Sequence, residues 1–402
     1  MRRVLAILSA IACVFTSAMA DGFSTSTEEG VLAAIATRLD KNEKQIERWE
    51  KINKLVKING FVQGLYEWSD DRTGDGTTGK SSFGVQRARL IIASELYKSK
   101  KGRVLDFWSY LDFMLMPKSP VLDLRFGYKH SKELNIIVGQ FQNPIHFEEQ
   151  FRPSKFEFID FSYAACNLAK MGGGDVTTKD VPLRETGFAF YGGFIQRDGY
   201  SIINYNIGFL NNVGAFTRNT NRSGDFFGRI FIKPTKALDF AIHYQWGEGN
   251  FASVKANNPD IYATYRWNGN PEYLVMHRWG AGFSYITESV FTRAEYICGL
   301  TGALPSESCY IEGGYKIYLP KQLGWAWAGT MIDYYCRDTF DLIKRDTRNA
   351  NIDMRYTLSL GWEPSVYYRI QLAYSLEQRL HYTFANNRTF GNGVKVLVTA
   401  SF

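Results

Sequence analysis

Basic side chains recur at two-residue spacing in segments that are otherwise apolar. In the segment 121–130, Asp123, Arg125 and Lys129 alternate with leucine and aromatic side chains. Arginine presents a planar fork of N–H donors that fits carboxylates and phosphates, and rings of Arg or Lys can select anions. The residues that we assign to such an anion path are Arg87, Arg89, Arg125, Lys129, Arg152, Lys155, Arg229, Arg278, Arg355, Arg369 and Lys395.

Carboxylates occupy the same faces as these cations. The same faces also hold Lys233, Arg293 and Lys316, and neighbours on one sheet face pair across strands. The basic residues outnumber the acids, so a modest positive excess is left. Three alternatives stay open: a weak anion preference, strict phosphate selectivity, and a path for other nutrients without anion preference. The acids are Glu95, Asp106, Asp112, Asp123, Asp239, Glu295, Glu312 and Asp353.

The two-residue rhythm predicts β-strands, because successive side chains of a strand point to opposite faces. It is clearest in the segments 121–130, 238–247, 351–362 and 366–376, where leucine or isoleucine lies mid-strand and aromatic residues lie near the ends. In the first of these we expect Leu122, Leu124 and Phe126 to face lipid. Such belts, with 15% aromatic residues overall, are typical of membrane-spanning barrels. The faces of 324–336 stay unassigned, because Asp333 shares its parity with two tryptophans.

Turn-rich breaks divide the chain into sixteen predicted strands in an all-β, antiparallel transmembrane barrel over residues 56–402. We expect the last strand to pair with the first and close the barrel, because a free edge would be a pairing hazard. Phe402 is then the signal for the barrel assembly machinery. The strands are 56–68, 83–97, 103–116, 121–130, 134–142, 185–194, 200–209, 224–233, 238–247, 277–286, 289–299, 308–319, 324–336, 351–362, 366–376 and 393–402.

Two segments precede the barrel. Arg2, Arg3, the apolar run 4–15 and the small residues Ala18 and Ala20 predict a signal peptide over 1–20 and export to the outer membrane of a Gram-negative bacterium. Residues 21–55 are predicted to form a helix with a heptad seam, which we expect to be a periplasmic coiled coil between protomers. The alternative is an amphipathic helix against the barrel mouth. The seam residues are Leu32, Ile35, Leu39, Asn42, Ile46, Trp49, Asn53 and Val56.

The longest break, 143–184, exceeds an ordinary hairpin loop. We expect it to fold into the lumen as a constriction, with Phe147, Phe151, Phe156, Phe158 and Phe161 against the wall. The alternatives are a surface lid and a contact with a neighbouring protomer.

Other function classes have little support. A net charge of +7 without a lysine-rich block argues against nucleic-acid binding. After residue 20 the cysteines are Cys166, Cys298, Cys309 and Cys336, and they contain no C-x-x-C pair that would favour a metal or redox site. Cys298 and Cys309 form a disulfide or remain two thiols. The histidines follow no nucleophile motif, so we expect no enzyme, no cofactor and no metal. They are His130, His146, His243, His277 and His381.

Three segments, Val85–Leu96, Ile137–Asp160 and Leu183–Gly192, resemble the phosphate-selective porin O and P family. The run Gly139-Gln140-Phe141 followed by Pro144 is the most specific part. The resemblance implies a sixteen-stranded homotrimeric outer-membrane channel among lipid and lipopolysaccharide, with an inward third outer loop and basic ladders that guide small anions. The chain departs from the family in its lining, because carboxylates are interspersed among the cations. A non-conducting structural barrel stays an alternative.

Overall fold

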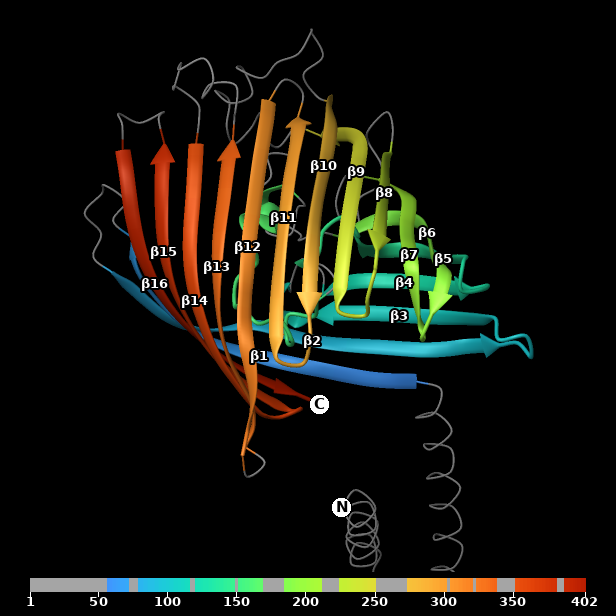
Figure 1. Ribbon diagram of the computed structural model, residues 1–402, viewed down its shortest axis with the longest axis horizontal. Coiled ribbons are helices and arrows are strands. Elements are labelled where there is room, and N and C mark those ends of the chain that lie inside the picture. The colour runs from blue at the N-terminus through green and yellow to red at the C-terminus, as the bar shows by residue number, and fades with distance from the viewer. Residues whose placement is uncertain are drawn as a thin grey trace, which may run out of the picture. The chain divides into compact units, whose positions relative to one another are not determined.

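Sixteen antiparallel strands close into one barrel in which each strand pairs with its neighbours in sequence (Figure 1). The predicted fold class is therefore confirmed. The computed structural model describes residues 56–71, 79–115, 120–148, 151–168, 184–211, 224–250, 273–301, 304–320, 323–337, 351–381 and 387–402. The predicted signal peptide and the seam residues Leu32 to Asn53 lie outside the described residues.

The strands lie within about five residues of their predicted positions, except β16, which begins at Asn387 and not at the predicted 393. In the connections that the structure describes there are two short helical turns, η1 (Phe113–Leu115) and η3 (Ala164–Leu168). No helix in the described ranges is long and apolar enough to span a membrane. The strands are β1 (Val56–Asp71), β2 (Lys80–Lys98), β3 (Val104–Asp112), β4 (Val121–Lys129), β5 (Asn135–Gln142), β6 (Arg184–Arg197), β7 (Tyr200–Leu210), β8 (Asp225–Ile232), β9 (Leu238–Asn250), β10 (Tyr273–Ile286), β11 (Val290–Thr301), β12 (Leu304–Leu319), β13 (Gly324–Arg337), β14 (Asn351–Ser365), β15 (Tyr368–His381) and β16 (Asn387–Ser401).

The first and last strands close the barrel, as predicted. Tyr66 of β1 lies opposite Val396 of β16. At the end of the β1–β16 pairing, the N–H of Gly60 donates to the carbonyl of Phe402 at 3.1 Å, and the N–H of Phe402 donates back to the carbonyl of Gly60 at 3.0 Å. Val56, which we also placed in the helical seam, is a strand residue, because β1 begins there.

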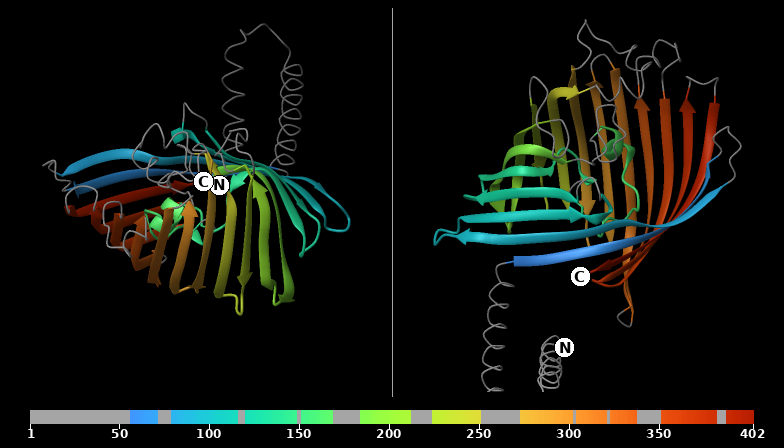
Figure 2. Two further views of the ribbon diagram at one scale, coloured as in Figure 1. Left: turned by 90° about the horizontal axis from the view of Figure 1, so that it is seen from above. Right: turned by 180° about the vertical axis from the view of Figure 1, so that it is seen from behind.

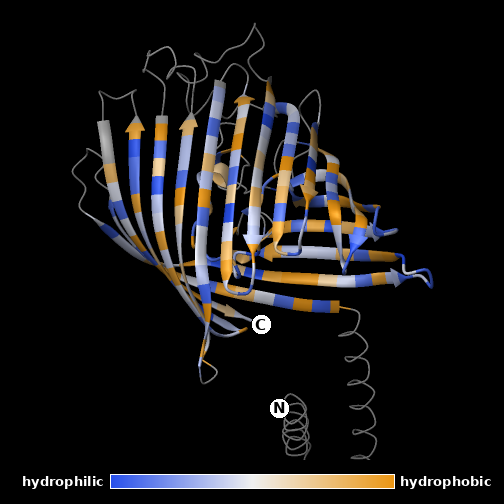
Figure 3. Cartoon of the chain, in the orientation of Figure 1, coloured by the Kyte–Doolittle hydropathy of each residue, from blue (hydrophilic) through white to orange (hydrophobic). Residues whose placement is uncertain are grey.

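Apolar and polar residues alternate along the strands (Figure 3), and the exposure of their side chains places the apolar residues outside and the polar ones inside. Ile242, Leu358 and Val398 are 60%, 48% and 49% exposed, whereas Gln245 and Thr399 of the same strands are buried. The faces predicted for 238–247, 351–362, 366–376 and 393–402 are therefore correct. A surface of this kind fits lipid, because the backbone polar groups are satisfied between strands.

The prediction for Leu122 is wrong. The pairing of β3 with β4 skips Leu122 between Tyr110–Asp123 and Leu111–Val121, which is a β-bulge. The extra residue breaks the two-residue alternation, and Leu122 is fully buried against Phe61, Ile91 and Tyr110. Leu124 and Phe126 keep the expected outward orientation.

The faces of β13, which the sequence did not settle, are now assigned. Ile332 is exposed, while Trp327, Met331 and Asp333 are buried. The two apolar residues face inward with the aspartate because Phe156 and Phe158 of the connection between β5 and β6 pack on them. The lumen wall is thus apolar where that connection covers it.

The contact between Gly60 and Phe402 makes barrel closure sensitive to one methyl group. A Cβ at Gly60 would meet the Phe402 ring and the carbonyl of Arg89 at 2.7 Å. We expect Gly60→Ala to destabilise the barrel by about 1–3 kcal/mol through overpacking. Reversible urea unfolding in micelles, followed by tryptophan fluorescence, measures the change.

Gly64→Ala is the matched control on the same strand, since a Cβ there has no neighbour within 4 Å. It should change the free energy of unfolding by no more than about 0.5 kcal/mol. Equal changes in the free energy of unfolding for Gly60→Ala and Gly64→Ala would contradict the close contact between Gly60 and Phe402.

Candidate functional site

The connection between β5 and β6 lies inside the barrel. Seen from above, this green segment lies within the curve of the orange and red strands (Figure 2). The described part covers residues 143–148 and 151–168, which we call the inner segment. Glu148 joins its two halves, because its buried carboxylate accepts hydrogen bonds from the N–H of Ser162 at 3.0 Å and from the Ser162 hydroxyl at 2.5 Å. Burial, and to a lesser degree Glu312, raises the pKa of Glu148 well above its ordinary value.

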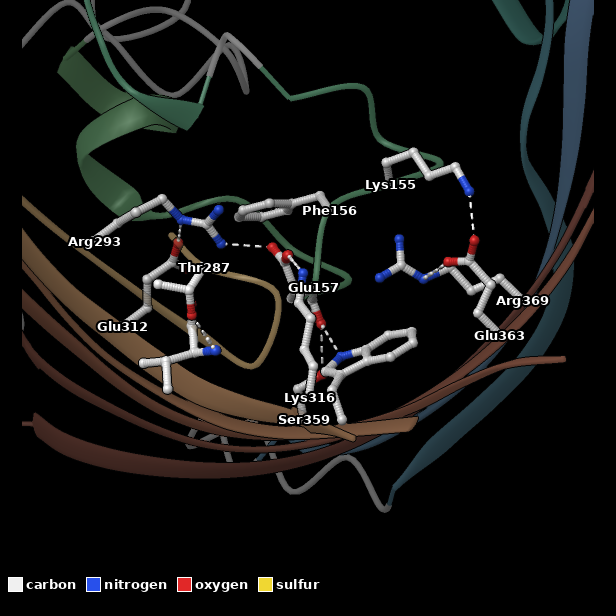
Figure 4. A network of polar contacts seen from close by, with 12 residues as sticks. Lys155, Phe156, Glu157, Thr287, Arg293, Glu312, Lys316, Ser359, Glu363 and Arg369 are labelled. Carbon is white, nitrogen blue, oxygen red and sulfur yellow. Dashed lines mark hydrogen bonds and ion pairs between the residues drawn. The ribbon is translucent and has the colours of Figure 1, made fainter. Parts of the chain in front are cut away.

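Glu157 is the main attachment of the inner segment (Figure 4). Its carboxylate pairs with Arg293 of β11 at 2.6 Å and with Lys316 of β12 at 2.6 Å. Its backbone carbonyl accepts from the next three strands, so one residue holds five consecutive strands. The donors to that carbonyl are Trp327 Nε1 of β13 at 3.2 Å, Ser359 Oγ of β14 at 2.8 Å and Gln371 Nε2 of β15 at 3.2 Å.

A second group of contacts holds the part that follows. Lys395 of β16 donates to both carboxylate oxygens of Asp160 at 2.8 Å. Arg355 Nη2 donates to the carbonyl of Phe161 at 2.5 Å and also pairs with Asp333, which accepts the N–H of Tyr163 at 2.7 Å. The described carboxylates of the inner segment are therefore all bonded. Glu148 is bonded within the segment, and Glu157 and Asp160 are bonded to the wall formed by β11–β16.

Phenylalanines fill the space beneath the inner segment. Phe156 and Phe158 pack with Phe291, Trp327 and Met331, partly covered by Phe151 and Phe161. Phe147 packs farther along the wall, with Phe231 and Ala241. Guanidinium groups lie over these rings as well: that of Arg293 is 4.3 Å from the Phe151 centroid. Such contacts keep buried cations in place beside aromatic side chains.

The opposite side of the inner segment borders a cavity of about 480 Å³. Its far wall is formed by β2, β3 and β4, with Gln142 and Arg184 at the ends of the neighbouring strands. Five arginines line it, more than any other residue type there: Arg87, Arg89, Arg152, Arg184 and Arg355.

These arginines fall into two groups. Arg89 pairs with Asp112 and Arg184 with Asp123, both at 2.7 Å, and Arg355 pairs with Asp333 as above. Arg87 instead donates through Nη1 to the amide oxygens of Gln63 and Gln86, each at 2.9 Å. Arg152 is exposed, with its guanidinium 5.8 Å from the Trp108 centroid, where Arg125 also lies at 5.7 Å. Among the described residues, Arg87, Arg125 and Arg152 form no ion pair.

The structure thus brings together part of the predicted set. Arg87, Arg89, Arg152 and Arg355 line the cavity, and Arg125 contacts Trp108 beside it. The remaining predicted cations lie elsewhere. Lys129 pairs with Asp106 at 3.0 Å, Lys155 with Glu363 at 2.6 Å and Lys395 with Asp160; Arg229 lies between Phe147 and Phe231; Arg278 donates to Thr301; Arg369 stacks on Trp327 at 4.1 Å.

Sequence reasoning missed several residues of this region. Arg184 lies one residue before the strand that we predicted to begin at 185. Trp108 shares its parity with Asp106 and Asp112, which would have placed it inside. Glu157 and Asp160 are acids within a phenylalanine-rich run, and a buried acid needs a partner, so this run could have indicated an attachment point.

The remaining candidates for chemistry form no further centre in the described part of the chain. No group of three or more His, Cys, Asp or Glu there could hold a metal ion. Cys166, Cys298, Cys309 and Cys336 are free thiols, so of the two alternatives for Cys298 and Cys309 the structure has the unpaired one.

Comparison with known proteins identifies the fold. No protein-family model matches the chain, and no curated protein matches its sequence. The outer membrane channel DcaP of Acinetobacter baumannii is 10% identical, with a TM-score of 0.59 over 86% of this chain and 97% of that one. OprB of Pseudomonas putida is 8% identical, with a TM-score of 0.59 over 89% and 96%. OmpT of Vibrio cholerae, in a trimer form, is 9% identical, with a TM-score of 0.55 over 86% and 99%.

At these identities the likeness shows the fold alone, which is that of the outer-membrane porin barrels. The finer resemblance to the phosphate-selective porins is supported by no family model and stays a prediction.

Removing the Glu157 carboxylate should release the inner segment. In Glu157→Gln, Lys316 and Arg293 lose this partner inside the barrel, at a cost of about 3 kcal/mol. We expect backbone amides of residues 151–163 to exchange hydrogen roughly a hundredfold faster, measured by mass spectrometry in micelles. Asp106→Asn is the control, because Asp106 pairs with Lys129 and not with the inner segment. Unchanged exchange in Glu157→Gln would contradict this attachment.

The ion pairs of Glu157 with Arg293 and Lys316 should persist at mildly acidic pH. Burial disfavours the Glu157 carboxylate, but Arg293 and Lys316 outweigh it and lower its pKa to about 2. A lowered pKa means that the stabilisation is present above the ordinary carboxyl range and is lost as the pH falls through the folded value. The exchange ratio between Glu157→Gln and the wild type should therefore stay constant from neutral pH to about pH 5 and approach one only as the pH falls to about 2. A ratio that falls to one already near pH 5 would contradict the ion pairs.

Proposed function

We propose that the protein is an outer-membrane channel for passive diffusion of small hydrophilic solutes, with a preference for anions. The barrel supports this, since its apolar exterior suits lipid and its interior is lined by charged and polar side chains. The inner segment would be the constriction. Selectivity would then come from its width and from the field of the charges beside it.

The observation that carries the anion preference is the excess of guanidinium groups without an ion pair at the cavity, whose lining aspartates Asp112, Asp123 and Asp160 are each paired with a cation. In the inner segment, the carboxylates of Glu157 and Asp160 are neutralised by Arg293, Lys316 and Lys395. On the cavity side, Arg87, Arg125 and Arg152 have no carboxylate partner among the described residues. A solute that passes the constriction therefore meets a positive field.

Phosphate is one anion that such a field admits, because a guanidinium edge binds an oxyanion through two hydrogen bonds. The lining does not favour phosphate strictly, since Arg89 and Arg184 are already paired with aspartates. We therefore propose a general anion preference that includes phosphate.

We further propose that the channel works as a homotrimer in the outer membrane, surrounded by lipid and lipopolysaccharide and inserted by the barrel assembly machinery through Phe402. The trimer form of the Vibrio cholerae protein of similar fold supports this assembly. The coiled coil over 21–55 would join the protomers, and the signal peptide over 1–20 would export them.

Charge reversal in the cavity should change the selectivity. A unit charge at 4 Å in water is worth about 1 kcal/mol, or about fivefold in ion occupancy. We expect the wild type to conduct chloride in preference to potassium, and Arg87→Glu/Arg152→Glu to prefer potassium. The zero-current potential across a planar bilayer in a potassium chloride gradient gives both values.

Lys155→Glu is the control for Arg152. It makes the same change of charge in the same segment, but Lys155 is 50% exposed, pairs with Glu363 and does not line the cavity. A shift in Lys155→Glu as large as that of Arg152→Glu alone, or a cation-selective wild type, would contradict the proposal.

A further inference from the structure

The cavity combines cationic and apolar walls. Met114 and Leu115 of η1 and Phe151 and Phe161 of the inner segment line the same space as Arg87 and Arg152. Met114 is 46% exposed although it belongs to this cavity. Apolar side chains do not stabilise a hydrated inorganic ion, whereas burying an apolar solute against them is favourable because it removes apolar surface from water.

The charged wall is arranged to hold an acid group. Both hydrogen bonds of Arg87 to Gln63 and Gln86 leave from Nη1, so its Nε–Nη2 edge is not used in them. Amide oxygens fix the direction of this guanidinium without neutralising it. Gln63 is itself held, because its amide donates to Thr399 at 3.1 Å and to the carbonyl of Pro153 at 3.4 Å. The edge can therefore bind a carboxylate, sulfonate or phosphate through two N–H groups.

The size of the cavity fits one small organic molecule. Ligand sites usually enclose about 300–1,000 Å³, mostly with apolar side chains and a few fixed polar groups. At about 480 Å³ this cavity lies within that range, and half of its lining residues are aromatic, aliphatic or thiol side chains; the other half are five arginines, three aspartates and two glutamines. An inorganic anion would reach the arginines and leave the apolar wall in contact with water.

We propose that this cavity is a binding site for small organic anions that carry one acid group on an apolar body, and that it binds them more tightly than inorganic or fully polar anions of equal charge. The inference rests on the proposed function, because the solute must enter the lumen. Arg87 and Arg152 bind the acid group, and Met114, Leu115, Phe151 and Phe161 cover the apolar body.

Block of the chloride current tests the site. Benzenesulfonate and methanesulfonate carry the same acid group and the same single charge at neutral pH, and differ only in the apolar body. In the purified protein in a planar bilayer, we expect benzenesulfonate to reduce the current at about a tenfold lower concentration. Equal concentrations for half-block in an anion-selective channel would overturn the inference and leave the proposed function intact. A cation-selective channel would overturn both.

Two neighbouring positions give a matched pair of variants. Met114 and Phe113 are each 46% exposed in the same turn, but only Met114 lines the cavity. Met114→Ser should reduce the advantage of benzenesulfonate to about threefold, and Phe113→Ser should leave it at about tenfold. Arg152→Gln should weaken block by both sulfonates alike. The same loss in both serine variants, or none in either, would place the apolar contact elsewhere and contradict the site.

Discussion

The attachment of Glu157 to five consecutive strands is the interaction on which the interior of the barrel depends. A barrel of this circumference needs something in its lumen if the passage is to be narrow, and a connection of this length loses much conformational entropy when it is fixed. The two ion pairs of the Glu157 side chain and the three hydrogen bonds to its carbonyl offset that cost at one residue. Glu148 and Asp160 fix the residues on either side.

This attachment also sets the charge of the passage. The inner segment and the β11–β16 wall neutralise one another, so neither contributes much field to the open side of the lumen. On the cavity side, Arg89 and Arg184 pair with aspartates, but Arg87 is held by amide oxygens and Arg152 lies over an aromatic ring. Because aromatic rings hold cations without cancelling their charge, Trp108 stabilises Arg125 and Arg152 while leaving their field available to a solute. In the channel proposed above, mechanical support and selectivity would thus be divided between two faces of one segment.

Much of the fold could be predicted from the sequence, because lipid outside and water inside force a strict alternation of side chains. The outward faces of 238–247 and 366–376 follow from that alternation, the sixteen strands from the turn-rich breaks between them, and the pairing of β1 with β16 from the need to pair two free edges. The alternation misleads where a strand is irregular or where the interior is not in contact with water. At Leu122 a bulge adds a residue, and at Trp327 and Met331 the interior is apolar because the inner segment covers it. Pairing of individual charges could not be predicted, since parity gives the face of a side chain and not its neighbour across the lumen.

Crystals of the protein soaked in rubidium bromide would test the central claim most directly, because the two ions are told apart by their anomalous scattering. The structure predicts bromide beside the Nε–Nη2 edge of Arg87 and beside Arg152, with Glu157 still bound to Arg293 and Lys316. Rubidium in that cavity, or an inner segment detached from the β11–β16 wall, would contradict it.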